Sequence, residues 1–296
     1  MLKFTDVHSL QKLPLETKIL YTQERIHEWY EYHNGNVCVA LSGGKDSMVL
    51  RHLVLNLYPD VTCVFSNTGV EFPEIQRHAL KYADKVIKPN RSFKGVLLKH
   101  GYPFPNKNVA KNLHYARVTE NADYQYELHN GRNSRGSFHI PTKWHFLLDS
   151  PFKWSHKCCD LLKINPFKKY FRESGKYSFV GTLAKESFGR LVSFSRYGCN
   201  RYGLTEYRKI STPLAIWTVD DIYNYTEKHN IELCSIYTKG YKRTGCVYCL
   251  FGCAQEKSPN RFELLKITHP KMFEYAMEEL DYKNVLPFVG VKHGFI

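Results

Sequence analysis

Residues 37–55 read VCVALSGGKDSMVLRHLVL, which is an apolar run, two adjacent glycines, a lysine and a second apolar run. The first run is typical of a buried β-strand, and the second of an α-helix that begins just after the glycines. Glycines in such a turn let the backbone approach an anion, and the free N–H groups of the helix start favour negative charge. Lys45 adds a positive charge and Ser47 a hydroxyl donor. This order predicts a phosphate-binding loop over residues 42–47, and a turn that holds no ligand is the weaker alternative.

The composition limits the class of protein. With 296 residues the chain can bury a large core, as one domain or as one domain with appendages. Its 42 Lys and Arg against 28 Asp and Glu give a net charge of +14. Such an excess attracts nucleic acid or a substrate with several phosphates, although a basic surface that only aids solubility is equally compatible. The sequence has neither a bilayer-spanning apolar stretch nor the pattern of a signal peptide, so we expect a cytoplasmic protein without a membrane partner.

Extended and helical segments alternate along the chain. We expect a leading amphipathic helix over 17–30, a helix that begins at Pro73, and further strands over 61–66, 85–88 and 178–181. Strands separated by helices predict an α/β fold, a parallel sheet with helices on both faces. The loops at Ser42, Thr68 and Gly181 would then open at the carboxyl edge of that sheet, where ligands bind.

One segment departs from this alternation. Residues from about 107 to 144 are polar, rich in Asn and Tyr, and include Arg117, Arg132 and Arg135. We interpret them as an insertion in a nucleotide-binding domain over 1–245, either a lid or a substrate-contacting arm, with an ordinary hairpin or a partly disordered loop as alternatives. Residues 246–296 would form a C-terminal extension.

Four of the nine cysteines form two pairs, the adjacent Cys158 and Cys159 and the C-x-x-C pair Cys246 and Cys249. In a cytoplasmic protein, cysteines are more often metal-binding or reactive than disulfide-bonded. Two adjacent side chains converge poorly on one tetrahedral zinc ion, whereas a cubane offers four separate iron corners. The pattern therefore favours a [4Fe-4S] cluster over zinc.

The remaining cysteines of interest have other interpretations. Cys38 and Cys63 fall in predicted strands and are expected to be buried apolar thiols. Cys253 is a further candidate for a ligand or a persulfide carrier. Cys199 has basic neighbours, which would lower its pKa and make it reactive, although a plain surface cysteine is the stronger interpretation.

Together these motifs resemble the phosphoadenosine phosphosulfate (PAPS) reductase family of the adenine-nucleotide α-hydrolase superfamily. Besides SGGKDS, the matching segments are NTGVEFPE at 67–74, GTLAKESFGR at 181–190 and PLAIWTVDDIY at 213–223. The run from Tyr237 to Cys246 resembles the family segment that leads into the second cysteine pair. The resemblance extends from the leading helix to about Cys249.

The resemblance implies a Rossmann-like nucleotide site and a cluster. The expected nucleotide-binding residues are Ser42, Gly43, Gly44, Lys45, Asp46, Ser47, Thr68, Gly69, Glu71, Gly181, Glu186, Ser187 and Arg190, of which Lys45 and Asp46 are expected to be catalytic. The expected ligands of a [4Fe-4S] cluster are Cys158, Cys159, Cys246 and Cys249, as in adenylylsulfate reductases and DNA phosphorothioation sulfurtransferases of the family. The implied nucleotide is ATP with Mg²⁺, or a sulfonucleotide such as PAPS or adenylyl sulfate.

Two departures from the family pattern argue against ordinary sulfonucleotide reduction. Sulfonucleotide reductases attack sulfur with a cysteine in a C-terminal Glu-Cys-Gly-Leu-His tail, whereas this sequence has no cysteine after Cys253. Leu183 stands where the family has an arginine, which removes a charged donor from the phosphate or sulfate pocket.

The sequence leaves three functions open. The first is an ATP-dependent, pyrophosphate-releasing iron–sulfur sulfurtransferase that acts on DNA or tRNA and receives sulfur or electrons from a donor protein. The second, ranked close behind, is a sulfonucleotide reductase in which Cys253 or Cys199 replaces the tail cysteine. The third is a regulator that binds nucleotide and cluster without turnover.

Overall fold

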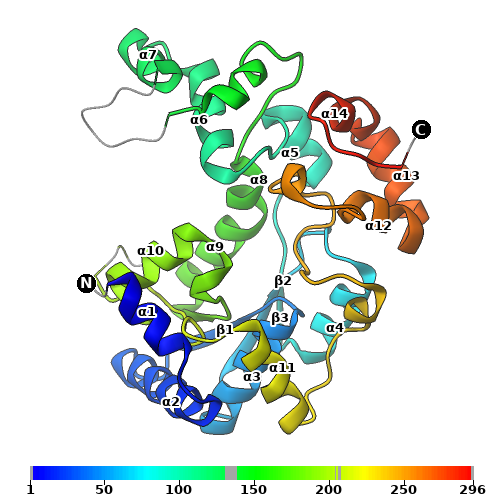
Figure 1. The fold of residues 1–296 in the computed structure, drawn as a ribbon. Helices are drawn as coiled ribbons and strands as arrows, with labels where there is room; N and C mark the ends of the chain where they lie inside the picture. The colour runs from blue at the N-terminus through cyan, green and yellow to red at the C-terminus, as the bar shows by residue number, and fades with distance from the viewer. Residues whose placement is uncertain (1–2, 131–138, 204, 206–207, 295–296) are drawn as a thin grey trace.

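A parallel sheet with its helices forms the lower half of the molecule in Figure 1. The structure is a computed structural model and describes residues 3–130, 139–203, 205 and 208–294. The strands are β1 (Val37–Leu41), β2 (Thr62–Ser66), β3 (Lys85–Ile87), β4 (Tyr177–Val180) and β5 (Ile210–Ser211). The helices are α1 (Phe4–Gln11), α2 (Leu15–Tyr32), α3 (Lys45–Leu57), α4 (Pro73–Tyr82), α5 (Phe93–His100), α6 (Lys107–Val118), α7 (Ala122–Asn130), α8 (Lys157–Cys159), α9 (Asn165–Ser174), α10 (Phe188–Tyr197), α11 (Val219–Lys228), α12 (Arg261–Thr268), α13 (Pro270–Glu279) and α14 (Tyr282–Phe288). Helices α5–α8 and α12–α14 lie above the sheet in Figure 1. The predicted α/β class is confirmed.

The order of the strands places the ligand crevice. The sheet runs β3-β2-β1-β4-β5, and β1 pairs in parallel with both β2 and β4. The chain moves outward from β1 to β3 and then returns to the other side of β1, so the strand order reverses between β1 and β4. Open parallel sheets bind ligands at such a reversal, outside the carboxyl ends of the strands. Because Ala40 pairs with Val180, the loops that follow β1 and β4 open side by side.

Both faces of the sheet are covered, as the apolar strands predict. On one face Val39 and Leu41 belong to a buried cluster with Val49 of α3. On the other face Cys38 packs with Tyr170 of α9. Cys38 and Cys63 are fully buried, which confirms their interpretation as apolar core thiols.

The predicted leading helix is confirmed as α2, and it is fixed to the segment over 213–223 by buried polar contacts. Trp217 donates a hydrogen bond to the Thr22 hydroxyl at 2.8 Å. The Lys18 ammonium, only 2% exposed, lies 2.6 Å from a carboxylate oxygen of Asp221. The same carboxylate caps α11 by accepting from the backbone N–H of Thr218. The segment over 213–223 therefore stabilises the position of α2 through these buried contacts.

The segment over 107–144 differs from its expected polar, loop-like character. Its described part forms α6 and α7, whose Leu113 and Leu128 are buried in one apolar cluster with Trp154 and Tyr282. Polar residues cover the outer faces of these helices. The polar composition of the segment therefore did not indicate that it is helical. Arg132 and Arg135 lie outside the described residues. The domain boundary expected at 245/246 stays a prediction.

Among the helices of the described residues, none has both the length and the apolar character that a bilayer crossing requires.

The Lys18–Asp221 pair generates a prediction on stability. Removal of one partner leaves the other charge buried, so Lys18→Ala is expected to lower the free energy of unfolding by about 3 kcal/mol. Urea unfolding followed by circular dichroism measures this loss. The matched control is Lys81→Ala, because the Lys81–Glu232 ion pair is exposed. The expectation is wrong if both variants unfold at the same urea concentration.

Candidate functional site

The predicted phosphate-binding loop forms a tight turn between β1 and α3. The Ser47 hydroxyl donates to the Gly44 carbonyl at 2.8 Å and accepts from the backbone N–H of Ser42 at 3.2 Å. Gly43 has a φ of +74°, and a Cβ there would lie 2.8 Å from the carbonyl oxygen of Ile75. The turn therefore requires glycine at this position.

Lys45 and Asp46, the expected catalytic residues, occupy the first turn of α3. The Lys45 side chain is buried, and its ammonium lies 2.7 Å from a carboxylate oxygen of Asp46. The backbone N–H of Lys45 donates to the Tyr237 hydroxyl at 2.8 Å. Burial raises the pKa of Tyr237 to about 12, so this group stays a neutral phenol at neutral pH.

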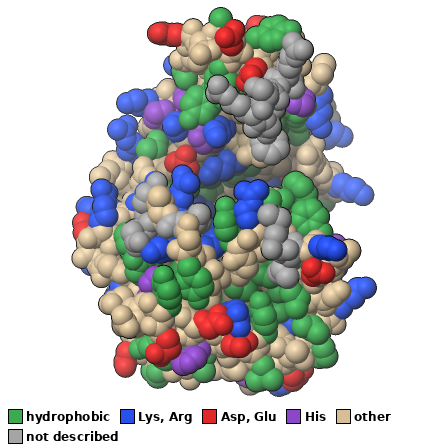
Figure 2. All heavy atoms as spheres, turned by 90° about the vertical axis from the view of Figure 1, so that its left-hand side faces the viewer, with side chains coloured by type: hydrophobic (Ala, Val, Ile, Leu, Met, Phe, Trp, Pro, Cys, Tyr) green, Lys and Arg blue, Asp and Glu red, His purple; other side chains and the backbone are tan. Residues whose placement is uncertain are grey.

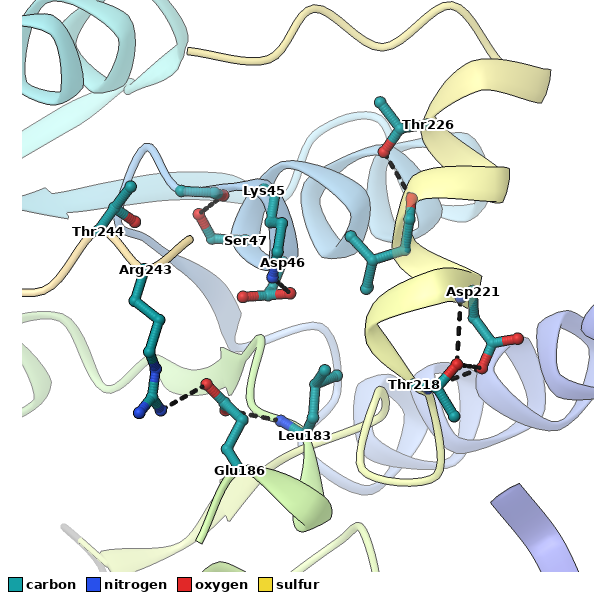
Figure 3. A network of polar contacts seen from close by, with 12 residues as sticks. Lys45, Asp46, Ser47, Leu183, Glu186, Thr218, Asp221, Thr226, Arg243 and Thr244 are labelled. Atoms are coloured by element: carbon teal, nitrogen blue, oxygen red, sulfur yellow. Dashed lines mark hydrogen bonds and ion pairs between the residues drawn. The ribbon is translucent and has the colours of Figure 1, made fainter. Parts of the chain in front are cut away.

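The loop after β4 approaches the same helix start. A Cβ on Gly181 would lie 2.9 Å from the backbone oxygen of Asp46, so only glycine fits there without a shift. Glu186 accepts from the backbone N–H of Leu183 at 3.2 Å and pairs with Arg190 and with Arg243, the latter at 3.2 Å. In Figure 3, Asp46 points from α3 toward the side where Glu186 and Arg243 lie.

Two arginines therefore stand beside the phosphate-binding loop. Burial, together with the nearby charge of Arg243, lowers the pKa of Arg190, while attraction by Asp46 acts in the opposite direction. Ser187 serves as the cap of α10, where its hydroxyl accepts from the backbone N–H of Arg190 at 3.3 Å. The arrangement places Lys45, Arg190 and Arg243 near the start of α3, and a group of cations beside a helix start suits a polyphosphate.

The loop after β2 joins this crevice to the cysteines. Its Thr68 hydroxyl donates to Glu71 at 2.5 Å, and Gly69 takes a φ of +76° to complete the turn. The backbone N–H of Val247, which lies between the two cysteines of the C-x-x-C pair, donates to the Val70 carbonyl at 2.8 Å. The second expected nucleotide loop and the second cysteine pair are thus hydrogen-bonded neighbours.

The four paired cysteines lie close enough to shift one another's pKa. A hydrogen bond with Cys159, burial and the charges of Cys249 and Cys246 raise the pKa of Cys158 far above its ordinary range. The bond from Cys158 lowers the pKa of Cys159, with help from Lys107 and Lys163. Burial, with the charge of Cys246, raises the pKa of Cys249 to about 12. The structure therefore brings together the vicinal pair and the C-x-x-C pair.

The spacing of these thiols bears on which group they hold. Within the ranges that the structure describes, no three His, Cys, Asp or Glu side chains converge closely enough to bind a single metal ion. A tetrahedral zinc ion needs its sulfur ligands about 3.8 Å apart, from Zn–S bonds of about 2.3 Å. A cubane binds each thiolate at a separate iron and so accepts a wider set. The four thiols interact with one another, and the [4Fe-4S] cluster that they are expected to hold stays a prediction.

Several site residues escaped the sequence analysis. Lys163 forms a hydrogen bond with Cys246, and attraction by negative charge on that sulfur raises the lysine pKa. Tyr237 and Thr244 contact the phosphate-binding loop, since a Cβ on Gly44 would lie 2.5 Å from the Thr244 hydroxyl. Lys163 follows the vicinal cysteines by four residues, a spacing that could have indicated it. Contacts 192 positions apart, such as Lys45 to Tyr237, have no sequence signal.

Cys199 and Cys253 are buried and are not activated nucleophiles. Cys199 is 3% exposed, so the preferred interpretation as a plain surface cysteine is wrong. Burial raises its pKa to about 12, so the alternative, a pKa lowered by basic neighbours, is wrong as well. Its nearest polar partner is the Tyr21 hydroxyl rather than a cation. Cys253 is 2% exposed, donates to the Leu250 carbonyl and also has a pKa raised to about 12 by burial.

Comparison with known proteins identifies the family. The sequence matches the phosphoadenosine phosphosulfate reductase domain over residues 36–114 and 141–250, well over half of the chain. The chain therefore belongs to the phosphoadenosine phosphosulfate reductase family, which confirms the resemblance drawn from its motifs.

Individual relatives are distant. An uncharacterized protein of Methanocaldococcus jannaschii is 23% identical over 90% of this chain and 53% of its own length. The adenosine 5′-phosphosulfate reductase of Geobacillus thermodenitrificans is 22% identical over 74% of this chain and 75% of its own. The phosphoadenylyl-sulfate reductase structure from Candida auris is 16% identical, with a TM-score of 0.43, over 83% of this chain and 96% of its own. The chain spans about half the length of the first curated relatives it matches.

The close approach of Gly181 to α3 generates a second prediction. Gly181→Ala is expected to push the β4 loop away from Asp46 and to lower the free energy of unfolding by roughly 1–3 kcal/mol. Gly189→Ala is the matched control, because a Cβ there meets nothing within 4 Å. Equal denaturation midpoints for the two variants would contradict the contact.

Proposed function

We propose that the protein is an ATP-dependent, pyrophosphate-releasing iron–sulfur sulfurtransferase that acts on nucleic acid. The observation that carries the proposal is the backbone hydrogen bond between Val247 and Val70, because it sets the cysteine pair directly against a nucleotide loop. A site that activates an acceptor with a nucleotide and then delivers sulfur needs these two parts side by side.

The phosphate-binding loop supports the first half of this reaction. Lys45 and the amides at the start of α3 would neutralise the β- and γ-phosphates of Mg²⁺-bound ATP. An acceptor oxygen attacks the α-phosphorus, the bond to the bridging oxygen breaks, and pyrophosphate leaves with the negative charge that these groups stabilise. A sulfur nucleophile then displaces AMP from the adenylated acceptor. Arg190 and Arg243 lie where they can bind the nucleotide and align its α-phosphorus with the attacking oxygen.

The cysteines support the second half. Cys158, Cys159, Cys246 and Cys249 would hold a [4Fe-4S] cluster, which supplies a place to bind sulfur or accept electrons. Lys163 and Lys107 lie beside these thiols and favour their ionised form, which ligation requires.

The charge of the protein supports a nucleic-acid acceptor. The net charge is +14, and Figure 2 shows Lys and Arg gathered across the middle of one face around a hollow, with Asp and Glu mostly above and below it. Contacts from such a surface to phosphates position a strand without reading its sequence.

A sulfonucleotide reductase is the second candidate, favoured by the similarity to curated adenosine 5′-phosphosulfate reductases. It needs a reactive thiolate, and the two proposed substitutes, Cys199 and Cys253, are buried thiols with raised pKa values. The reductase therefore ranks below the sulfurtransferase. A regulator that binds without turnover has no specific observation in its favour.

The proposal predicts loss of pyrophosphate release in one variant. Lys45→Ala removes the cation beside the leaving group and should lower pyrophosphate release from Mg-ATP by roughly 10²–10³-fold. The assay uses anaerobically purified protein with tRNA or DNA. Lys271→Ala, at an exposed position on α13, is the matched control. Sulfite formation from adenylyl sulfate and a thiol, with no pyrophosphate from ATP, would identify a reductase instead.

The proposed cluster predicts the iron and sulfide content of the protein. Anaerobically purified protein should contain about four irons and four sulfides per chain. Serine substitution of Cys158, Cys159, Cys246 or Cys249 should lower the iron content and bleach the visible absorption, whereas Cys199→Ser should retain both. Stoichiometric zinc without sulfide would refute the cluster.

A further inference from the structure

The helical segment that begins at the vicinal cysteines continues into α9. Residues 157–174 form α8, a π-helical stretch over Asp160–Ile164 and then α9, and the backbone stays right-handed helical at both junctions. A π-helical turn inside an α-helix is frequent at functional sites. In Figure 1, α8 and α9 follow one another from the upper half of the molecule down to the sheet. A helix of this length extends over roughly 27 Å, with Cys158 and Cys159 near its N-terminal end.

The side chains of α9 divide into a buried face and a basic outer face. Tyr170 is buried against the sheet. Lys168, Lys169 and Arg172 lie on the opposite side, at a spacing that places them on one stripe of the helix. Lys169 and Arg172 are exposed. At a rise of about 1.5 Å per residue, the stripe begins about 14 Å from Cys159 and ends about 20 Å from it.

Helix α6 adds a second basic face beside the cysteines. It contains Lys107, Lys111 and Arg117 and no acidic residue. Lys107 and Lys111 are exposed and lie one helical turn apart. The Lys107 ammonium lies 3.2 Å from a carboxylate oxygen of Asp160, the residue that follows Cys159. The basic faces of α6 and α9 therefore flank the vicinal cysteines.

Positive charge is concentrated on these helices rather than spread evenly over the surface. Residues 157–174 contain five Lys or Arg and two acidic residues, each of which is paired with a lysine. By contrast, α2 contains two basic and four acidic residues, and α11 and α13 each contain one basic and three acidic residues. A surface that only aids solubility does not require such segregation, whereas cations gathered on one surface are typical of proteins that bind a polyanion.

A row of cations along a helix fits the regularly spaced phosphates of a nucleic-acid backbone. A duplex carries one phosphate about every 3.4 Å along each strand. The interval of about 14–20 Å between Cys159 and the stripe therefore spans about four to six nucleotides. Phosphate contacts fix the register of a nucleic acid on a protein. The stripe can thus hold an acceptor while a nucleotide farther along the strand reaches the cysteines.

We propose that the outer faces of α9 and α6 bind the phosphate backbone of the acceptor nucleic acid, with Lys169 and Arg172 contacting phosphates about four to six nucleotides from the one at the cysteines. The ligand of this surface is the acceptor of the proposed function, on which the inference rests. The surface lies outside the nucleotide crevice and the set of four cysteines. Because it contacts only phosphates, it binds without selecting a base sequence.

Fluorescence anisotropy at several salt concentrations tests this surface, with labelled tRNA and with a labelled DNA duplex of about two helical turns. For Lys169→Ala/Arg172→Ala we expect roughly 10- to 50-fold weaker binding at about 0.1 M salt. The slope of log K against log salt should fall by about 0.9 for each lost contact on the duplex. The charge-conserving variant Lys169→Arg/Arg172→Lys should bind as wild type does, because a phosphate contact of this kind requires the charge.

The matched control is Lys271→Ala/Lys283→Ala. It removes two exposed lysines from α13 and α14, one of them paired with a glutamate as Lys169 is. An unchanged affinity and salt slope in Lys169→Ala/Arg172→Ala would overturn the inference, as would an equal loss of binding in the control. Poly-glutamate that competes as well as an equal charge of tRNA would also overturn it and assign the surface to an acidic protein.

Binding is measured without ATP, so failure of this surface is distinguishable from failure of the proposed function. If wild type releases pyrophosphate from Mg-ATP while Lys169→Ala/Arg172→Ala binds nucleic acid normally, only the assignment of the surface is wrong. If wild type releases no pyrophosphate while the variant loses nucleic acid, the surface stands and the adenylating reaction is wrong.

Discussion

The backbone hydrogen bond from Val247 to Val70 is the contact on which the functional half of the molecule depends. It joins the loop after β2, whose position the sheet fixes, to the loop that carries Cys246 and Cys249. Other bonds hold the same loop from behind. Arg261 donates to the Cys249 carbonyl at 2.6 Å, and the buried Tyr282 donates to that of Tyr248. The bond to Val70 is the direct backbone contact between the second cysteine pair and the loop after β2.

The segment over 237–246 is a second connection between the phosphate-binding loop and the paired cysteines. Tyr237 accepts from the Lys45 amide, Arg243 pairs with Glu186, and Cys246 bonds with Lys163. An anion that takes the Lys45 amide must displace the Tyr237 hydroxyl, nine residues before Cys246. The chain between Tyr237 and Cys246 therefore contacts both the start of α3 and the vicinal cysteine segment.

Sequence reasoning succeeded where the signal is local. The apolar run, the glycines and the helix over 37–57, and the helix start at Pro73, follow from neighbouring residues and are found in the structure. It failed at Cys199, because basic neighbours in the chain do not show that the thiol faces Tyr21 in the core. The helices of 107–130 were missed because their apolar faces are short and are buried only against distant partners such as Tyr282.

The protonation states of the four paired cysteines determine how many protons a metal group must displace when it binds. The hydrogen bond with Cys159, together with burial, raises the pKa of Cys158, and burial raises the pKa of Cys249, so both thiols favour the neutral form. The hydrogen bond from Cys158 lowers the pKa of Cys159. Ligation must remove the remaining protons, and the energy for doing so comes from the metal–sulfur bonds. Lys163 is placed to offset the charge that results, since it bonds with Cys246 and feels Cys159 and Glu71. Glu71 in turn accepts from the Thr68 hydroxyl. A negative charge on the cysteine group and the Glu71 carboxylate of the loop after β2 therefore act on the same lysine side chain.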